Sequence, residues 1–249
     1  MQNPLDLIHH SLHYRCMYTH ICFDIETASG MQNFDMLSID LQQHRIHKCQ
    51  SIKKYDQTHE RATPAELYGL KAWIYAEFGR IVCISVWRLV YDDDIMCELQ
   101  SFYGDDEHDI LTQFCEYLWA QTSHIKLIWH NIKEFDMPYV CRRMIMHDIS
   151  LPDCLQLQWK KPRDVPHCDT LELWKFGDLK NYISLALLAH LLGLPSPKDD
   201  INGADVSTVF WQWDVQRIST YCLKDVWTTA QVFLKLKHTK KNVYKLELT

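Results

Sequence analysis

The chain has 249 residues, of which 47% are hydrophobic and 23% charged, and this suits one globular domain with a substantial core. It contains only seven glycines, no two of them closer than ten residues. A dinucleotide-binding fingerprint needs glycines two and three residues apart, and a Walker loop needs two glycines five apart, so both phosphate-binding motifs are excluded. The net charge of −6 argues mildly against a typical basic nucleic-acid-binding protein.

The ten cysteines are dispersed, the closest pair being six residues apart, so the sequence has no Cys-x-x-Cys motif. This spacing disfavours zinc ribbons and thioredoxin-like redox sites. Several cysteines lie within apolar runs, which predicts reduced thiols in the core of a cytoplasmic protein. No apolar stretch reaches the length of a signal peptide or a membrane span, so we expect no membrane partner.

The first half of the chain predicts strands around a polar insertion. Residues 20–25 (HICFDI) form an apolar run typical of a buried strand. Residues 30–66 are polar, and we expect them to form most of a partly helical insertion. Residues 79–90 are β-branched and apolar, and residues 95–104, which follow a turn, are the expected hairpin partner.

The second half alternates helices with short strands. Acidic cap candidates precede a helical stripe of Ile110, Leu111, Phe114, Cys115 and Leu118. A strand at 125–130 is followed by a helix from about 136, whose apolar stripe is Met137, Val140, Cys141, Met144 and Ile145. A short strand or turn near 167–170 precedes two further helices, at 183–193 and at about 214–236. This order predicts one α/β domain with a mixed five-stranded sheet of ribonuclease-H-like architecture.

Two carboxylates, Asp24 and Glu26, close the first strand. Because they are two residues apart, both side chains point to the same face of the strand. Two carboxylates on one face repel each other unless a positive charge lies between them. The alternative is a solvated strand end followed by a turn.

Asp136 follows the strand at 125–130 and stands where the next helix begins. An Asp at this place is also a favoured N-cap, and Pro138 suits the first helical turn. Such a position nevertheless directs the carboxylate toward the end of the sheet, where the site of an α/β protein is expected.

Tyr221 and Asp225 are four residues apart on the last helix and therefore share one face. A surface carboxylate paired with Lys224 or Lys180 is the alternative for Asp225. Taken together, Asp24, Glu26, Asp136 and Asp225 can bind two Mg²⁺ ions, which prefer oxygen ligands. Two such ions stabilise both the attacking and the leaving oxygen of a phosphodiester displacement.

The motifs FDIET, HNIKEFD and YCLKD occur in this order, and the set resembles the tyrosine (DEDDy) branch of the DEDD 3′-5′ exonucleases. Over residues 20–236 the chain is similar to stand-alone bacterial exonucleases related to the proofreading domain of family B DNA polymerases. The resemblance implies metal ligands at Asp24, Glu26, Asp136 and Asp225, with Tyr221 as the fifth catalytic residue, which positions the water. It implies two Mg²⁺ as cofactors, with Mn²⁺ as a substitute. It further implies a nucleotide pocket lined by Thr27, Asn131 and Phe135.

Lys180 and Tyr182 lie in the stretch KFGDLKNYISL, which we also place near the substrate. The expected activity is hydrolysis at the 3′ end of single-stranded DNA, with release of nucleoside 5′-monophosphates. Two alternatives remain open, an exoribonuclease that trims RNA 3′ ends and a non-catalytic nucleic-acid-binding subunit. No protein partner can be deduced from the residues.

We expect three parts along the chain. Residues 1–19 form an N-terminal extension, and residues 20–236 form the exonuclease domain. Within it, an insertion at residues 30–78 is expected to cover the cleft. Residues 237–249 form a basic C-terminal tail.

Overall fold

The computed structural model describes residues 18–91, 95–121, 124–131, 135–161, 164–178, 180, 182–195 and 200–237. Nearly all of the predicted N-terminal extension (1–19) and of the basic tail (237–249) lies outside the described residues.

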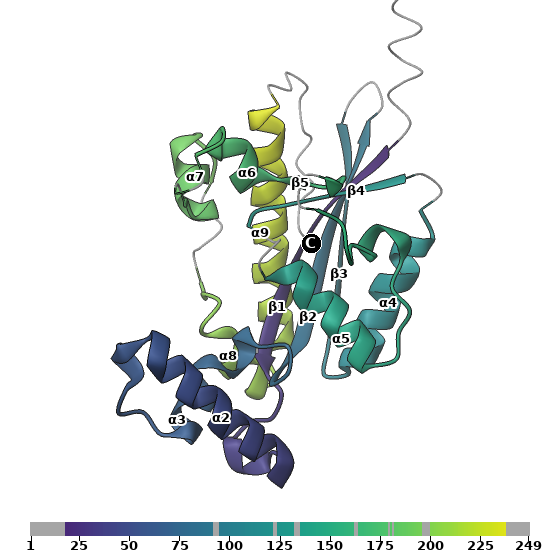
Figure 1. The fold of residues 1–249 in the computed structure, drawn as a ribbon. Coiled ribbons are helices and arrows are strands. Elements are labelled where there is room, and N and C mark those ends of the chain that lie inside the picture. The colour runs from purple at the N-terminus through teal and green to yellow at the C-terminus, as the bar shows by residue number, and fades with distance from the viewer. Residues whose placement is uncertain are drawn as a thin grey trace, which may run out of the picture.

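A five-stranded mixed sheet forms the centre of the domain, with strand order β3-β2-β1-β4-β5 (Figure 1). Strand β1 pairs antiparallel with β2 and parallel with β4, while β2–β3 is antiparallel and β4–β5 parallel. The bounds are β1 Tyr18–Ser29, β2 Gly79–Tyr91, β3 Ile95–Tyr103, β4 His124–Trp129 and β5 Cys168–Asp169. This sheet confirms the predicted α/β, ribonuclease-H-like fold.

Helices cover both faces of the sheet. One face carries α4 Glu107–Trp119 and α5 Asp136–Met146, and the other carries α8 Val206–Trp211 and α9 Val215–Leu236 (Figure 1). Two short helices, α6 Thr170–Lys175 and α7 Leu185–Leu191, pack on α9. Short 3₁₀ helices span Phe34–Met36, Gln57–His59, Ala72–Ile74 and Asp153–Leu155.

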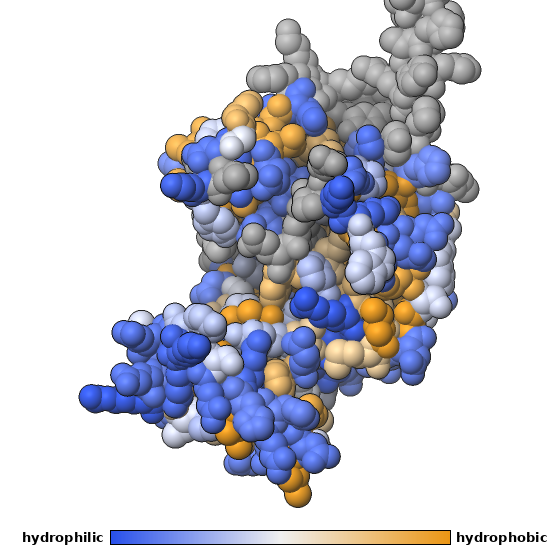
Figure 2. All heavy atoms as spheres, in the orientation of Figure 1, coloured by the Kyte–Doolittle hydropathy of each residue, from blue (hydrophilic) through white to orange (hydrophobic). Residues whose placement is uncertain are grey.

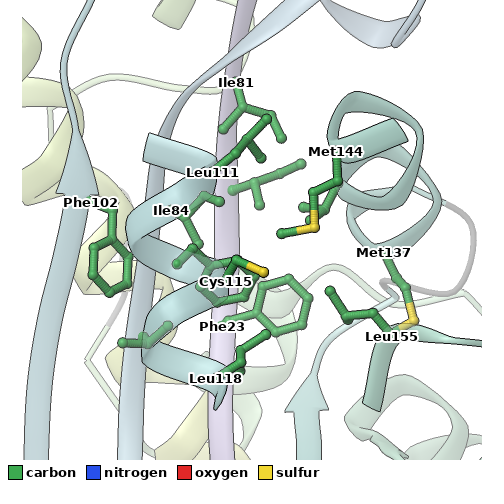
Figure 3. Close-up of a cluster of buried hydrophobic side chains, with 14 of the residues drawn as sticks. Phe23, Ile81, Ile84, Phe102, Leu111, Cys115, Leu118, Met137, Met144 and Leu155 are labelled. Carbon is green, nitrogen blue, oxygen red and sulfur yellow. The ribbon is translucent and has the colours of Figure 1, made fainter. Parts of the chain in front are cut away.

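The side chains of β1 point alternately to the two faces of the sheet, apolar ones to one face and the two carboxylates to the other. Ile21, Phe23 and Ile25 enter the core beneath α4 and α5, and Figure 3 shows Phe23 among the side chains of that cluster. Successive side chains of a strand point to opposite faces. The carboxylates of Asp24 and Glu26 are therefore presented to α9, on the same side as buried Cys22.

The predicted helical stripes are confirmed with one exception. All five stripe residues of α4 are buried, and so are Met137, Val140 and Met144 of α5. Ile145 is 58% exposed, so its place in the core was predicted wrongly. One residue turns a helix by about 100°, which puts Ile145 beyond the buried stripe that ends near Met144.

The insertion at residues 30–78 is helical, as predicted, with α2 Ile39–Tyr55 and α3 Pro64–Lys71. Thr63 and Glu66 form a reciprocal capping box that starts α3. The guanidinium of Arg45, which is fully buried, stacks over the rings of Tyr68, Tyr75 and Phe78. Figure 2 shows α2 and α3 as a protruding lobe beyond the end of β1, and its covering of the cleft stays a prediction.

Eight cysteines have described side chains, and all eight are free thiols, five of them buried. The predicted core position is thus confirmed for these five cysteines, and their reduced state stays a prediction. None of the described helices is both long and apolar enough to cross a bilayer.

Candidate active site

Strand β1 brings Asp24 and Glu26 to the middle of the molecule. The parallel pairing with β4 ends at Cys22, while the antiparallel pairing with β2 continues to Ser29. The register with β2 shifts between Glu26 and Thr27, a β-bulge of the kind that re-aims side chains beside active sites. Glu26 is only 7% exposed, so the alternative of a solvated strand end is wrong.

Asp136 reaches the same place from α5. It is the first helical residue, and the N-cap is Phe135, which makes no side-chain cap hydrogen bond. The simple capping interpretation of Asp136 is therefore wrong. Its carboxylate is buried and accepts a hydrogen bond from the backbone amide of Ile25, three residues beyond Cys22, where the pairing of β1 with β4 ends.

The third element is α9, which contributes Tyr221, Cys222 and Asp225. The Tyr221 hydroxyl is hydrogen-bonded to the Asp225 carboxylate one turn along the helix. The thiol of Cys222 lies 3.4 Å from the carbonyl oxygen of Asp24 and 3.6 Å from its Oδ2 atom. Helix α9 thus packs on β1 and adds its side chains to the site.

Burial and neighbouring carboxylates raise the pKa values of three groups in this site, Asp24, Asp136 and Tyr221. Burial, followed by the charges of Asp136, Asp225 and Glu26, raises the pKa of Asp24 well above its usual range. Burial also raises the pKa of Asp136 to about 7, with added contributions from Asp225 and Asp169. Burial and the nearby carboxylates raise the pKa of Tyr221, so its hydroxyl stays protonated at neutral pH.

The donor set fits a hard divalent cation. One ligand atom each from Asp24, Glu26 and Cys222 lie within 4.8 Å of one another. The charges of Asp136 and Asp225 act on the same group. Carboxylate oxygens are the ligands that Mg²⁺ prefers, and a cation among them would remove the repulsion that raises their pKa values.

Three predicted nucleotide-pocket residues border this centre. The buried Thr27 hydroxyl donates to the carbonyl oxygen of Trp73, at 2.9 Å, and so ties the insertion to β1. Asn131 follows β4 in a left-handed conformation (φ 63°), and Phe135 packs its ring against Tyr139. Contact of these residues with a nucleotide stays a prediction.

The two remaining predicted substrate residues lie between α6 and α7. Lys180 is exposed, and Tyr182 is 68% exposed. The next residue, Ile183, places its carbonyl oxygen 2.9 Å from Nε2 of His130 at the end of β4. This contact attaches the segment to the strand that leads toward Asp136.

Two residues of the site were not singled out from the sequence. One is Cys222, although its place next to Tyr221 is a signal in the sequence. Asp169 is buried, and its charge contributes to the raised pKa of Asp136. Only the pairing of β5 with β4 brings it near, and no spacing in the sequence predicts that pairing.

The fold is that of a ribonuclease-H-like domain, and the convergent carboxylates give it an acidic site. Residues 71–248 match the family described as predicted 3′-5′ exonucleases related to the exonuclease domain of PolB, and the chain belongs to this family. Asp136, Tyr221 and Asp225 lie within the matched residues, whereas Asp24 and Glu26 precede them and join the site through the fold. No curated protein matches the chain significantly.

Proposed function

We propose that this protein is a metal-dependent 3′-5′ exonuclease that removes nucleotides from the 3′ end of single-stranded DNA. The supporting observation is the convergence of four carboxylates from β1, α5 and α9, where burial and the charges of the other three raise the pKa of Asp24. Family membership supports the same reaction class and direction.

In this proposal Asp24, Glu26, Asp136 and Asp225 hold two Mg²⁺ ions. When bound, the ions supply charge that stabilises the attacking and leaving oxygens at the scissile phosphate. The Tyr221 hydroxyl orients the attacking water by a hydrogen bond. Because its pKa is raised, it acts as a neutral hydroxyl and not as a general base.

The products are a nucleoside 5′-monophosphate and a DNA strand with a new 3′ hydroxyl. Asn131, Phe135, Lys180 and Tyr182 are assigned to the terminal nucleotides of the strand. Exposed Tyr182 offers a face on which a base can stack, and Lys180 a cation for a phosphate.

The test is digestion of matched single-stranded DNA and RNA oligonucleotides, labelled at either end, with Mg²⁺, Mn²⁺ or EDTA. We expect metal-dependent shortening from the 3′ end of DNA and nucleoside 5′-monophosphates as the released product. Faster digestion of RNA would reassign the substrate. If the protein binds the oligonucleotide equally well with Mg²⁺ and with EDTA and releases no mononucleotide, it is a non-catalytic nucleic-acid-binding subunit and the proposed activity is wrong.

A further inference from the structure

A buried carboxylate outside the proposed ligand set joins two segments at the border of the site. Asp169 is 5% exposed and is the N-cap of α6. Its Oδ1 atom accepts hydrogen bonds from the amide of Leu171, at 2.9 Å, and from the amide of Asn131, also at 2.9 Å. The first bond caps its own helix, whereas the second reaches across to the end of β4.

The conformation of Asn131 makes that second bond important. Asn131 has a φ of 63°, which most residues other than glycine adopt rarely and Asn tolerates better than most. The chain turns there from β4 toward Asp136. The hydrogen bond from the Asn131 amide to Asp169 therefore holds the point from which the chain continues to α5 and Asp136.

A neighbouring set of hydrogen bonds fastens the same junction. The Thr170 hydroxyl lies 2.9 Å from the carbonyl oxygen of Trp129 and 2.9 Å from Nδ1 of His130. The other ring nitrogen of His130 lies 2.9 Å from the carbonyl oxygen of Ile183. The start of α6, the end of β4 and the segment after Tyr182 are therefore held as one unit.

We propose that Asp169 is a positioning residue of this active site, whose carboxylate fixes the Asn131 turn and thereby the placement of Asp136. The inference rests on the proposed function. Both backbone amides donate to the same side-chain oxygen, Oδ1 of Asp169, so one acceptor atom holds the two segments together. The role needs an oxygen acceptor at this position, so Asn would preserve most of it and Ala would not.

The experiment compares Asp169→Ala, Asp169→Asn and a control, Asp106→Ala. Asp106 is also an N-cap carboxylate that accepts two amides, those of His108 and Asp109 at 2.9 and 3.3 Å, but it caps α4. For each protein we would measure kcat and KM on single-stranded DNA, Mn²⁺ affinity by electron paramagnetic resonance, and thermal stability. The Mn²⁺ measurement reports on the carboxylates without any turnover.

We expect Asp169→Ala to lower kcat and to weaken Mn²⁺ binding, each by about 10- to 100-fold. Asp169→Asn should recover most of both, while Asp106→Ala loses stability and keeps both near the wild-type values. The inference is overturned if Asp169→Ala changes only stability, or if Asp169→Asn is as impaired as Asp169→Ala. If the wild type binds Mn²⁺ but digests neither DNA nor RNA, the proposed function fails and Asp169 is still judged on Mn²⁺ affinity. Absence of Mn²⁺ binding by the wild type overturns both.

Discussion

Two buried acidic sites in this protein use their carboxylates in opposite ways. Glu107, at the start of α4, is 4% exposed and is surrounded by donors. It accepts hydrogen bonds from the amide of Ile81 at 2.7 Å and from Nε and Nη2 of Arg143, and Nε2 of His147 lies 3.0 Å away. At Asp24, by contrast, each neighbouring charge that shifts the pKa belongs to another carboxylate.

The difference separates a carboxylate that stabilises the fold, Glu107, from one that is placed to bind a cation, Asp24. The partners of Glu107 are side chains and a backbone amide of the protein itself, so its charge is neutralised on folding. The Asp24 site gathers negative charge that folding alone leaves repulsive, which is the state expected of a site that takes up cations. Substitutions at the two sites should therefore have opposite consequences.

The largest effect is expected from Asp24→Ala and Asp225→Asn. Each should lower Mg²⁺-dependent digestion of a 3′-labelled oligonucleotide by at least about 10³-fold, because a carboxylate that holds the metal ions is removed. Thermal stability without metal should not fall, since repulsion is relieved. Asp200→Asn is the control, because Asp200 is an exposed carboxylate paired with Arg217. Full activity in both site variants would refute the mechanism.

The opposite pattern, a loss of stability without a loss of activity, is expected at Glu107. Arg143→Ala leaves the Glu107 carboxylate buried without its guanidinium and should lower the free energy of unfolding by about 3 kcal/mol. Turnover per folded molecule should persist. Arg88→Ala is the matched control, because the Arg88–Glu98 ion pair is far more exposed than the Glu107 pair and is worth less than about 1 kcal/mol. Urea unfolding measures both, and equal losses would show that burial of the Glu107 pair is unimportant.

The acidic site around Asp24 should also make the stability of the protein depend on pH. The pKa of Asp136 is about 7 in the folded protein, above its ordinary value of 3.8, so the folded state binds more protons between these values. Its contribution to stability is therefore complete below about pH 4 and is lost as the pH rises through 7. Above pH 7, added Mg²⁺ should restore stability.

The comparison of wild type with Asp136→Asn isolates this effect. Burial lowers the pKa of His20 to about 4, so His20 contributes a slope of opposite sign between pH 4 and 6.5. That slope cancels in the difference between the two proteins. Thermal unfolding at pH 5 and pH 8, with EDTA, should show the wild type losing more stability than the variant. A parallel loss in both would contradict the raised pKa.

The sequence predicted those parts of the fold whose residues carry a periodic pattern. The apolar stripe of α4 and the apolar strands are local signals, and both are confirmed in the structure. Helix α8 was not predicted, because VSTVFW is rich in residues that favour strands. It is helical because Val206, Val209 and Phe210 bury one face against the sheet.

The features of the site also fall into those with a local signal in the sequence and those without one. The motif residues Asp24, Glu26, Asp136 and Tyr221 could be proposed from spacing and resemblance. The hydrogen bond from Ile25 to Asp136 and the approach of Asp169 to Asn131 depend on where β4 stops and how β5 pairs with it. Such contacts between distant residues have no local signal, so the sequence alone could not predict them.

The smallest expected effect is that of Tyr221→Phe, which removes one hydroxyl and keeps the ring in its cluster with Phe210 and Ile218. We expect kcat to fall about tenfold, because the water loses one orienting hydrogen bond while the carboxylates remain. The loss should be the same across pH 6–9, since the raised pKa keeps the hydroxyl protonated throughout. Tyr103→Phe is the control, because its hydroxyl donates to Gln216 at 2.6 Å on the surface. If Tyr221→Phe matches that control in kcat, the site acts through its carboxylates alone; if its loss grows with pH, the hydroxyl titrates and acts as a base.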